Sequence, residues 1–171
     1  MPKPAVLIVL IAVMAVLSVT TNAQDGRRPS RNETDATAIR ALLADGFETS
    51  WNNHQPATAA TPDKCESGAV FINVTGGWLK GCEAWQRLIT PLHAPGGQFH
   101  DHTRRHAIED LQFVRPDVAI AVVRTLDIRR AGVPTAGEET RGLVVVSKRD
   151  GRWRLNANQN GRILETPAGN R

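Results

Sequence analysis

The sequence has no tyrosine, only two cysteines, and no second hydrophobic stretch as long as the one near its N-terminus. Two cysteines in 171 residues exclude a small scaffold held together by several disulfides. Long Pro, Gly or Ser tracts are also missing, and 41% hydrophobic residues beside 22% charged residues argue against wholesale disorder. The length suits one globular domain with its own core.

The net charge is also small, because 17 Asp and Glu residues nearly balance 21 Lys and Arg residues. The arginines are scattered and form no basic stripe interleaved with aromatic residues, which is the pattern of nucleic-acid binding. We therefore expect no nucleic-acid partner.

The N-terminal segment is not expected to belong to the fold. Lys3 precedes an apolar run over residues 5–19, and a small residue, Ala23, precedes Gln24. This is the pattern of a secretory signal peptide, so we expect residues 1–23 to be removed and the mature protein to be secreted or periplasmic, without stable membrane insertion. The alternative is an uncleaved anchor, although the run is shorter than the ~20 residues that span a bilayer.

After the signal peptide, the chain is expected to consist of three parts. We expect a flexible leader over residues 24–33, one domain over residues 34–164 and a flexible tail over residues 165–171. In an oxidising compartment Cys65 and Cys82 could form one disulfide, if their Cα atoms lie close enough. The spacing does not decide between this bridge and packed thiols.

The first half of the domain predicts helices. Starting near Thr34 or Asp35, apolar residues recur at three- and four-residue steps up to Trp51, which indicates one buried helix face. Gln55 continues this face unless the helix has already ended at Asn53, and Pro56 favours such an end. A short helical turn over residues 57–60 and a third helix from about residue 83 to 93 follow.

The second half predicts antiparallel strands, after an earlier hairpin that turns at Gly76-Gly77. Asp150-Gly151 is typical of a second tight hairpin. The expected strands cover residues 69–74, 78–80, 99–114, 118–129, 140–149 and 152–163. Early helices and late strands predict an α+β domain with helices on one face of a curved sheet.

Several short motifs occur in a defined order: Trp51-Asn52, Ala69-Val70-Phe71, Thr75-Gly76-Gly77-Trp78, Gly81, Pro116-Asp117-Val118-Ala119, Asp150-Gly151-Arg152-Trp153-Arg154 and Asn160. From about residue 35 to 163 the chain thereby resembles the SgcJ/EcaC group of the SnoaL-like, nuclear transport factor 2-like superfamily. The resemblance implies a cystatin-like cone, in which three N-terminal helices wrap a strongly bent antiparallel sheet, with a pocket at its mouth and a homodimer formed through the sheet. The group carries an oxidoreductase label but no cofactor motif, so no cofactor is expected.

The resemblance also suggests site residues. Enzymes of the superfamily often use Asp or His in the pocket, but the matching positions here are Gln55 and Gln159. Amides orient a ligand without exchanging a proton near neutral pH. His93, at the end of the third helix, is then the pocket candidate that can titrate.

The alternation of side chains along the predicted strands indicates on which face Gln159 and Arg124 lie. Gln159 shares a face with Trp153 and Leu155, which would direct it toward the core. Arg124 lies on a mainly apolar row of the strand over residues 118–129, so it needs an anionic partner. That partner is either a ligand carboxylate or a structural acid such as Glu109 or Glu138.

Two further clusters have competing interpretations. His100, His102 and His106 share one face of an extended strand, as metal ligands can, but Arg104 shares that face and would repel a divalent ion. A polar, solvated strand is the preferred interpretation, and no metal site is predicted. Among the aromatic residues, we expect Trp51 and Phe71 to border the cavity and Trp153 to belong to the core; Trp78 is not assigned.

These observations favour an exported small-molecule-binding protein with a mainly apolar pocket for a hydrophobic or carbonyl-containing ligand. The alternative is a cofactor-independent enzyme of cyclase, isomerase or hydratase type that uses His93 as acid and base. A missing pocket aspartate favours binding over catalysis. The expected ligand-binding residues are Trp51, Gln55, Phe71, His93, Arg124 and Gln159.

Overall fold

The computed structural model describes residues 31–129 and 134–163. The predicted signal peptide, most of the predicted leader and the predicted tail lie outside these residues. No helix in the described part of the chain is both long enough and apolar enough to cross a membrane.

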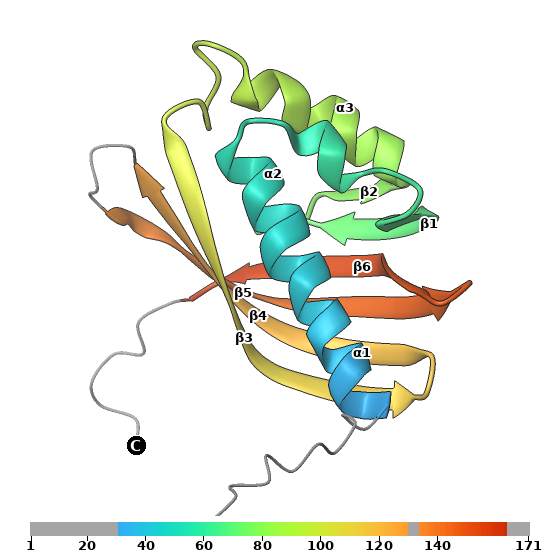
Figure 1. The fold of residues 1–171 in the computed structure, drawn as a ribbon. Helices are drawn as coiled ribbons and strands as arrows, with labels where there is room; N and C mark the ends of the chain where they lie inside the picture. The colour runs from blue at the N-terminus through green and yellow to red at the C-terminus, as the bar shows by residue number, and fades with distance from the viewer. Residues whose placement is uncertain (1–30, 130–133, 164–171) are drawn as a thin grey trace, which may run out of the picture.

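Figure 1 shows helices lying over one face of a strongly bent sheet. The helical elements are α1 (Arg31–Arg40), the π-helical segment η1 (Ala41–Glu48), α2 (Thr49–Asn52), the 3₁₀ turn η2 (Pro56–Ala59) and α3 (Cys82–His93). The strands are β1 (Cys65–Ile72), β2 (Trp78–Lys80), β3 (His102–Arg115), β4 (Val118–Arg129), β5 (Pro134–Arg149) and β6 (Arg152–Arg162). The α+β prediction is confirmed.

The six strands form one sheet in the order β2-β1-β6-β5-β4-β3. Neighbours pair antiparallel except β1 and β6, which run parallel, so the sheet is mixed at this one position. The hairpin at Asp150-Gly151 is confirmed, since both residues have positive φ. Strand β5 begins at Pro134, which is earlier than predicted, because its first residues continue the pairing with β4.

Elements α1, η1 and α2 follow one another without a break and are together called the first helix. It begins at Arg31, at the start of the described residues, and Asp35 lies inside it rather than capping it. The buried Asp35 carboxylate instead accepts hydrogen bonds from Lys148 Nζ at 2.5 Å and Trp153 Nε1 at 3.1 Å. Burial on its own would raise the pKa of Asp35, but these hydrogen bonds outweigh it and hold the pKa below its ordinary value. The contact fixes the start of the helix to β5 and β6.

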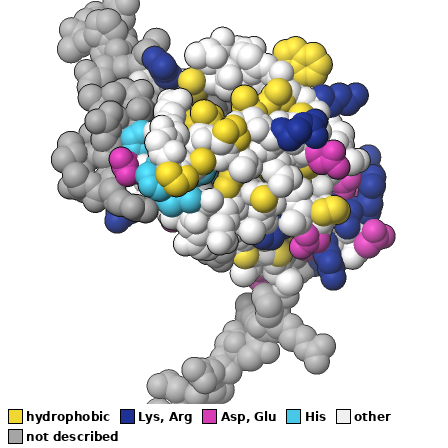
Figure 2. Space-filling model, turned by 90° about the horizontal axis from the view of Figure 1, so that it is seen from above, with side chains coloured by type: hydrophobic (Ala, Val, Ile, Leu, Met, Phe, Trp, Pro, Cys, Tyr) yellow, Lys and Arg dark blue, Asp and Glu magenta, His cyan; other side chains and the backbone are white. Residues whose placement is uncertain are grey.

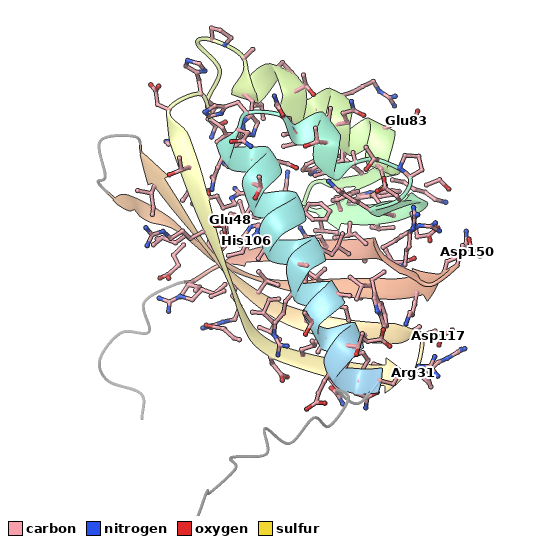
Figure 3. The ribbon with its side chains drawn as sticks, in the orientation of Figure 1. Arg31, Glu48, Glu83, His106, Asp117 and Asp150 are labelled. Carbon is pink, nitrogen blue, oxygen red and sulfur yellow. A yellow bond between two sulfur atoms is a disulfide. The ribbon has the colours of Figure 1, made fainter. Side chains whose placement is uncertain are left out.

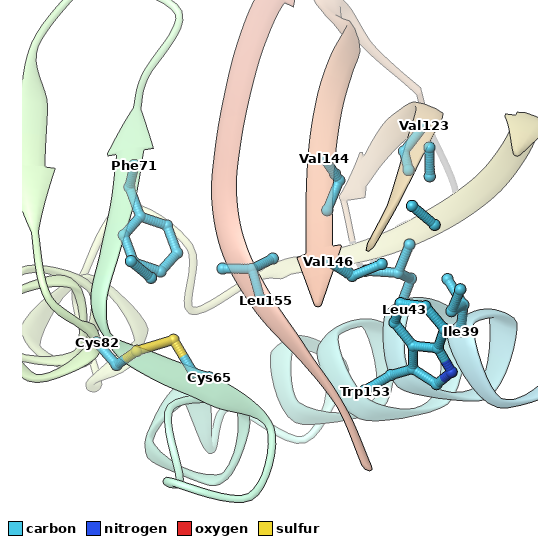
Figure 4. Close-up of a cluster of buried hydrophobic side chains, with 13 residues drawn as sticks. Ile39, Leu43, Cys65, Phe71, Cys82, Val123, Val144, Val146, Trp153 and Leu155 are labelled. Carbon is cyan, nitrogen blue, oxygen red and sulfur yellow. A yellow bond between two sulfur atoms is a disulfide. The ribbon is translucent and has the colours of Figure 1, made fainter. Parts of the chain in front are cut away.

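The hydrophobic core lies between the first helix and the concave face of the sheet (Figure 4). Ile39 and Leu43 from the helix pack with Val146, Trp153 and Leu155 from the sheet. Trp153 is 5% exposed, so the prediction that it belongs to the core is confirmed.

Cys65 at the start of β1 forms a disulfide with Cys82 at the start of α3, with the Cα atoms 6.2 Å apart. We expect the Cys65→Ser/Cys82→Ser double variant to lose about 3 kcal/mol of unfolding free energy, because the bridge restricts the unfolded chain. Urea unfolding of both proteins measures this difference. Equal midpoints with and without the bridge would contradict the expectation, and added reductant should affect only the parent.

Candidate functional site

A cavity of about 300 Å³ opens between the first helix, α3 and the concave face of the sheet. Its wall is mainly apolar and aromatic: Leu43, Phe47, Trp51, Phe71, Leu79, Trp85, Leu88, Ile89, Phe99, Val123, Val144 and Leu155. Polar side chains also line it: Ser50, Asn73, Gln98, Arg104, His106, Thr125, Asp127, Thr140, Asn158, Asn160 and Arg162. Such a mixture is typical of small-molecule sites.

The first helix is fixed to the edge strand β3 by two side chains four residues apart. Glu48 Oε2 accepts a hydrogen bond from the backbone N–H of His106 at 2.6 Å, and Figure 3 shows both residues near the middle of the helix. Asn52 accepts from the backbone N–H of Arg104 at 2.6 Å and donates to its carbonyl at 2.9 Å. These contacts cover backbone groups that an edge strand otherwise leaves unpaired, and they hold one wall of the cavity in place.

An ion pair stands at one end of the cavity. Arg104 donates from Nε to Asp127 Oδ1 at 2.7 Å and from Nη2 to Oδ2 at 3.0 Å. The guanidinium also lies over the Trp51 ring, 3.3 Å from its centroid. Asp127 is 8% exposed, so the two charges neutralise each other in a largely dry setting.

His106 is the histidine that lines the cavity within the described residues. Its Nδ1 is 3.2 Å from the Leu43 carbonyl, which can only accept, so Nδ1 carries the proton and Nε2 keeps its lone pair. Burial and then the nearby charge of Arg104 lower the pKa of His106 to about 4. The imidazole is therefore neutral at pH 7.

An irregularity in β6 decides which of its residues face the cavity. The pairing of β5 with β6 shifts between Val145 and Val146, where Asn156 is an extra residue. Trp153 and Leu155 face inward before this bulge, whereas Asn158, Asn160 and Arg162 line the cavity after it. Gln159 is therefore exposed, and its predicted place on the core face is wrong.

Gly142 on β5 makes room for these asparagines. A Cβ atom there would lie 2.5 Å from Asn160 Oδ1 and 2.7 Å from the Gln159 carbonyl oxygen. We expect Gly142→Ala to lower the unfolding free energy by about 1–3 kcal/mol, because the clash involves backbone that cannot rotate away. Gly68→Ala is the matched control, since no atom lies within 4 Å of its Cβ position. Thermal unfolding compares them, and equal stabilities would contradict this account of Gly142.

The prediction that Gln55, His93 and Gln159 meet in the cavity is wrong, because none of the three lines it. The helix ends at Asn52, and His54 takes a positive φ, so Gln55 is turned outward and exposed. His93 is 3% exposed but packs behind Trp51, with ring centroids 4.3 Å apart.

His93 belongs instead to a group of histidines at one edge of the molecule, where Figure 2 shows imidazoles gathered together. His54 Nδ1 and His93 Nδ1 lie 3.1 Å apart, and the His54 and His100 rings are 5.6 Å apart. Burial, followed by His54 and Arg104, lowers the pKa of His93 to about 4. Among the described residues, no three His, Cys, Asp or Glu side chains are arranged to hold a metal ion.

Arg124 also lies away from the cavity. It is exposed on the outer face of β4 and forms an ion pair with Glu139. Of the two alternatives for its partner, a ligand carboxylate or a structural acid, the structural acid is therefore the arrangement found, although neither suggested acid is the partner. Glu109 pairs with Arg141 instead, at 2.6 Å.

Trp51 and Phe71 do line the cavity, as predicted; their contact with a ligand stays a prediction. Sequence reasoning missed Arg104, Asp127 and the inward residues of β6. An acid near the end of the mainly apolar strand over residues 118–129, with an arginine in the adjacent predicted strand, was the available indication of the ion pair.

Comparisons with known proteins place the fold. No protein-family model and no curated protein matches the chain by sequence. A solved domain of unknown function with a cystatin-like fold from Nostoc punctiforme has a TM-score of 0.68 and 23% identity, over 77% of this chain and 78% of that chain. Hexachlorocyclohexane dehydrochlorinase LinA-type3 from Novosphingobium barchaimii has a TM-score of 0.63 and 20% identity, over 82% of this chain and 94% of that chain.

A putative scytalone dehydratase from Novosphingobium aromaticivorans gives a TM-score of 0.59 and 13% identity, over 82% of this chain and 92% of that chain. The chain has the cystatin-like, nuclear transport factor 2-like fold that its sequence predicted. At these identities the likeness concerns the fold.

Proposed function

We propose that this protein binds a small, largely apolar molecule in the cavity between its first helix and the sheet. The observation that carries the proposal is a mainly apolar cavity of about 300 Å³ that polar side chains such as Thr125, Asn158 and Asn160 also line. A cavity of this volume with a few polar groups among apolar ones is the usual form of a small-molecule site. The resemblance to the SgcJ/EcaC group remains part of this proposal.

Titration calorimetry with 2-naphthalenemethanol, a neutral aromatic probe, tests the proposal. Filling the cavity with Val144→Phe is expected to weaken binding roughly tenfold or more, because Val144 lines the space. Val114→Phe is the matched control, since Val114 is 55% exposed and does not line the cavity. Val123→Phe repeats the test if the first variant unfolds. Unchanged binding by folded Val144→Phe and Val123→Phe would count against a ligand in this cavity.

Catalysis is a second candidate, because His106 lines the cavity and its Nε2 carries no proton. A neutral imidazole in that tautomer is the form that accepts a proton, so the acid-base role assigned to His93 in the alternative hypothesis passes to His106. The dehydrochlorinase and the putative scytalone dehydratase indicate that the fold is compatible with enzymes. In a turnover assay, His106→Gln should abolish product formation while keeping ligand affinity if the protein is an enzyme.

Export and dimerisation complete the proposal. The predicted signal peptide and the disulfide between Cys65 and Cys82 both support an oxidising compartment outside the cytosol. N-terminal sequencing of the exported protein should find Gln24 first.

The outer sheet face carries the apolar residues that support a homodimer: Val118, Ile120, Val122, Leu143 and Val145. Light scattering should give twice the chain mass, and Leu143→Glu should halve it.

A further inference from the structure

Four titratable side chains line the cavity within the described residues, and their charges do not cancel. Arg104 and Asp127 neutralise each other through two hydrogen bonds. His106 is neutral at pH 7 because burial lowers its pKa to about 4. Arg162 forms no ion pair with any described residue, so the cavity carries one uncompensated positive charge.

The positive charge stands at the end of a row of unused hydrogen-bonding groups. Beyond the bulge at Asn156, the side chains of Asn158, Asn160 and Arg162 line the cavity, and none bonds to another described side chain. Asn158 Oδ1 is buried without a partner. An asparagine amide can turn to present its NH₂ group, and a guanidinium only donates, so the row suits an acceptor.

The order of these residues along β6 indicates how a ligand would be oriented in the cavity. Arg162 is exposed at the end of β6, opposite Thr140, whereas Asn158 lies further in, opposite Val144. An anionic group at Arg162 would keep part of its hydration, while an apolar body attached to it would reach Phe71 and Val144 inside the cavity. A carboxylate is the matching group, because it accepts only and pairs with a guanidinium through two hydrogen bonds.

We propose that the cavity prefers carboxylic acids with an apolar body, and that Arg162, aided by Asn160 and Asn158, binds the carboxylate. This inference rests on the ligand-binding function proposed above and names the chemical class of its ligand.

Two probes of nearly equal shape test the preference: 2-naphthoate and 2-naphthalenemethanol, titrated into the full chain at pH 7.5. The parent should bind the carboxylate about tenfold tighter or more, as expected for charge-assisted hydrogen bonds. Arg162→Gln should remove this preference and leave the affinity for the alcohol within about twofold. Arg152→Gln is the matched control, because it removes the same charge at the opposite end of β6 and outside the cavity.

The outcomes separate the two proposals. Equal affinities for the two probes, or a carboxylate preference that survives in Arg162→Gln, would overturn the assignment of Arg162 while ligand binding itself stands. A preference lost equally in Arg152→Gln would also overturn it, because the effect would then be one of net charge. Failure of both probes to bind the folded parent would count against the proposed function, and with it this inference.

Discussion

Replacing Asp127 with alanine is expected to lower the free energy of unfolding by about 3–5 kcal/mol. The reason is that Arg104 would keep its charge in a setting where its side chain is only 19% exposed and lies over the Trp51 ring. Its remaining partners cannot replace a carboxylate bound through two hydrogen bonds. Urea unfolding of the parent and the variant measures the loss.

Asp117→Ala is the matched control for this variant. Asp117 also pairs with an arginine, Arg115, at 3.2 Å, but the Arg115 side chain is 68% exposed and the Asp117 side chain is 47% exposed. Exposed pairs contribute little, so the control should lose no more than about 1 kcal/mol. The double variant Arg104→Met/Asp127→Leu should recover most of the stability that Asp127→Ala loses, because no charge is left unpaired. Similar losses in Asp127→Ala and Asp117→Ala would contradict the account of the buried pair.

Acid is expected to destabilise the protein between about pH 6.5 and pH 4. His93 and His106 both have a folded-state pKa of about 4, mainly because they are buried. In this range the unfolded chain binds protons at both residues and the folded chain does not, so stability is full above pH 6.5 and falls as the pH falls. Each histidine should account for about 2–3 kcal/mol at pH 4.

Denaturant unfolding at intervals from pH 8 to pH 4 measures this loss. His106→Gln should reduce it by about half, because the amide does not titrate. Stability that stays constant from pH 7 to pH 5 would contradict this expectation, because both imidazoles would then take up protons as readily in the folded protein as in the unfolded chain. Protonation of Asp35 destabilises the protein only at lower pH, since its pKa is held below the ordinary carboxyl value of about 3.9.

Local patterns predicted most of the fold. Asp150-Gly151 predicted a tight hairpin, and the strand Val118–Arg129 was predicted with the observed bounds. The repeated apolar steps of the first helix correctly placed Ile39, Leu43 and Trp51 on its buried face. These features depend on turn geometry and periodicity, which neighbouring residues in the sequence determine.

The face of β4 that meets the core could not be predicted in the same way, because both rows of that strand are mainly apolar. The larger residues Val118, Ile120 and Val122 face outward, whereas the small residues Ala119 and Ala121 are fully buried beneath the first helix. Close packing of a helix on the sheet favours small side chains at the contact, and this depends on tertiary structure. Arg124 follows the larger residues and so lies outside.

The polar part of the site depended on a single inserted residue. The bulge at Asn156 exchanges inward and outward positions for the rest of β6, so Gln159 leaves the cavity and Asn158 enters it. Alternation along a strand carries no information about such a shift, since one extra residue reverses every later side chain. Sequence reasoning therefore found the cavity's aromatic wall through Trp51 and Phe71 but not its polar groups.

A crystal structure of the protein soaked with 2-naphthalenemethanol tests whether a small apolar molecule binds in the cavity. The naphthalene ring is expected between the first helix and β5, in contact with Trp51, Phe71 and Val144. A space filled by rearranged side chains, or a probe bound only on the outer surface of the sheet, would contradict it.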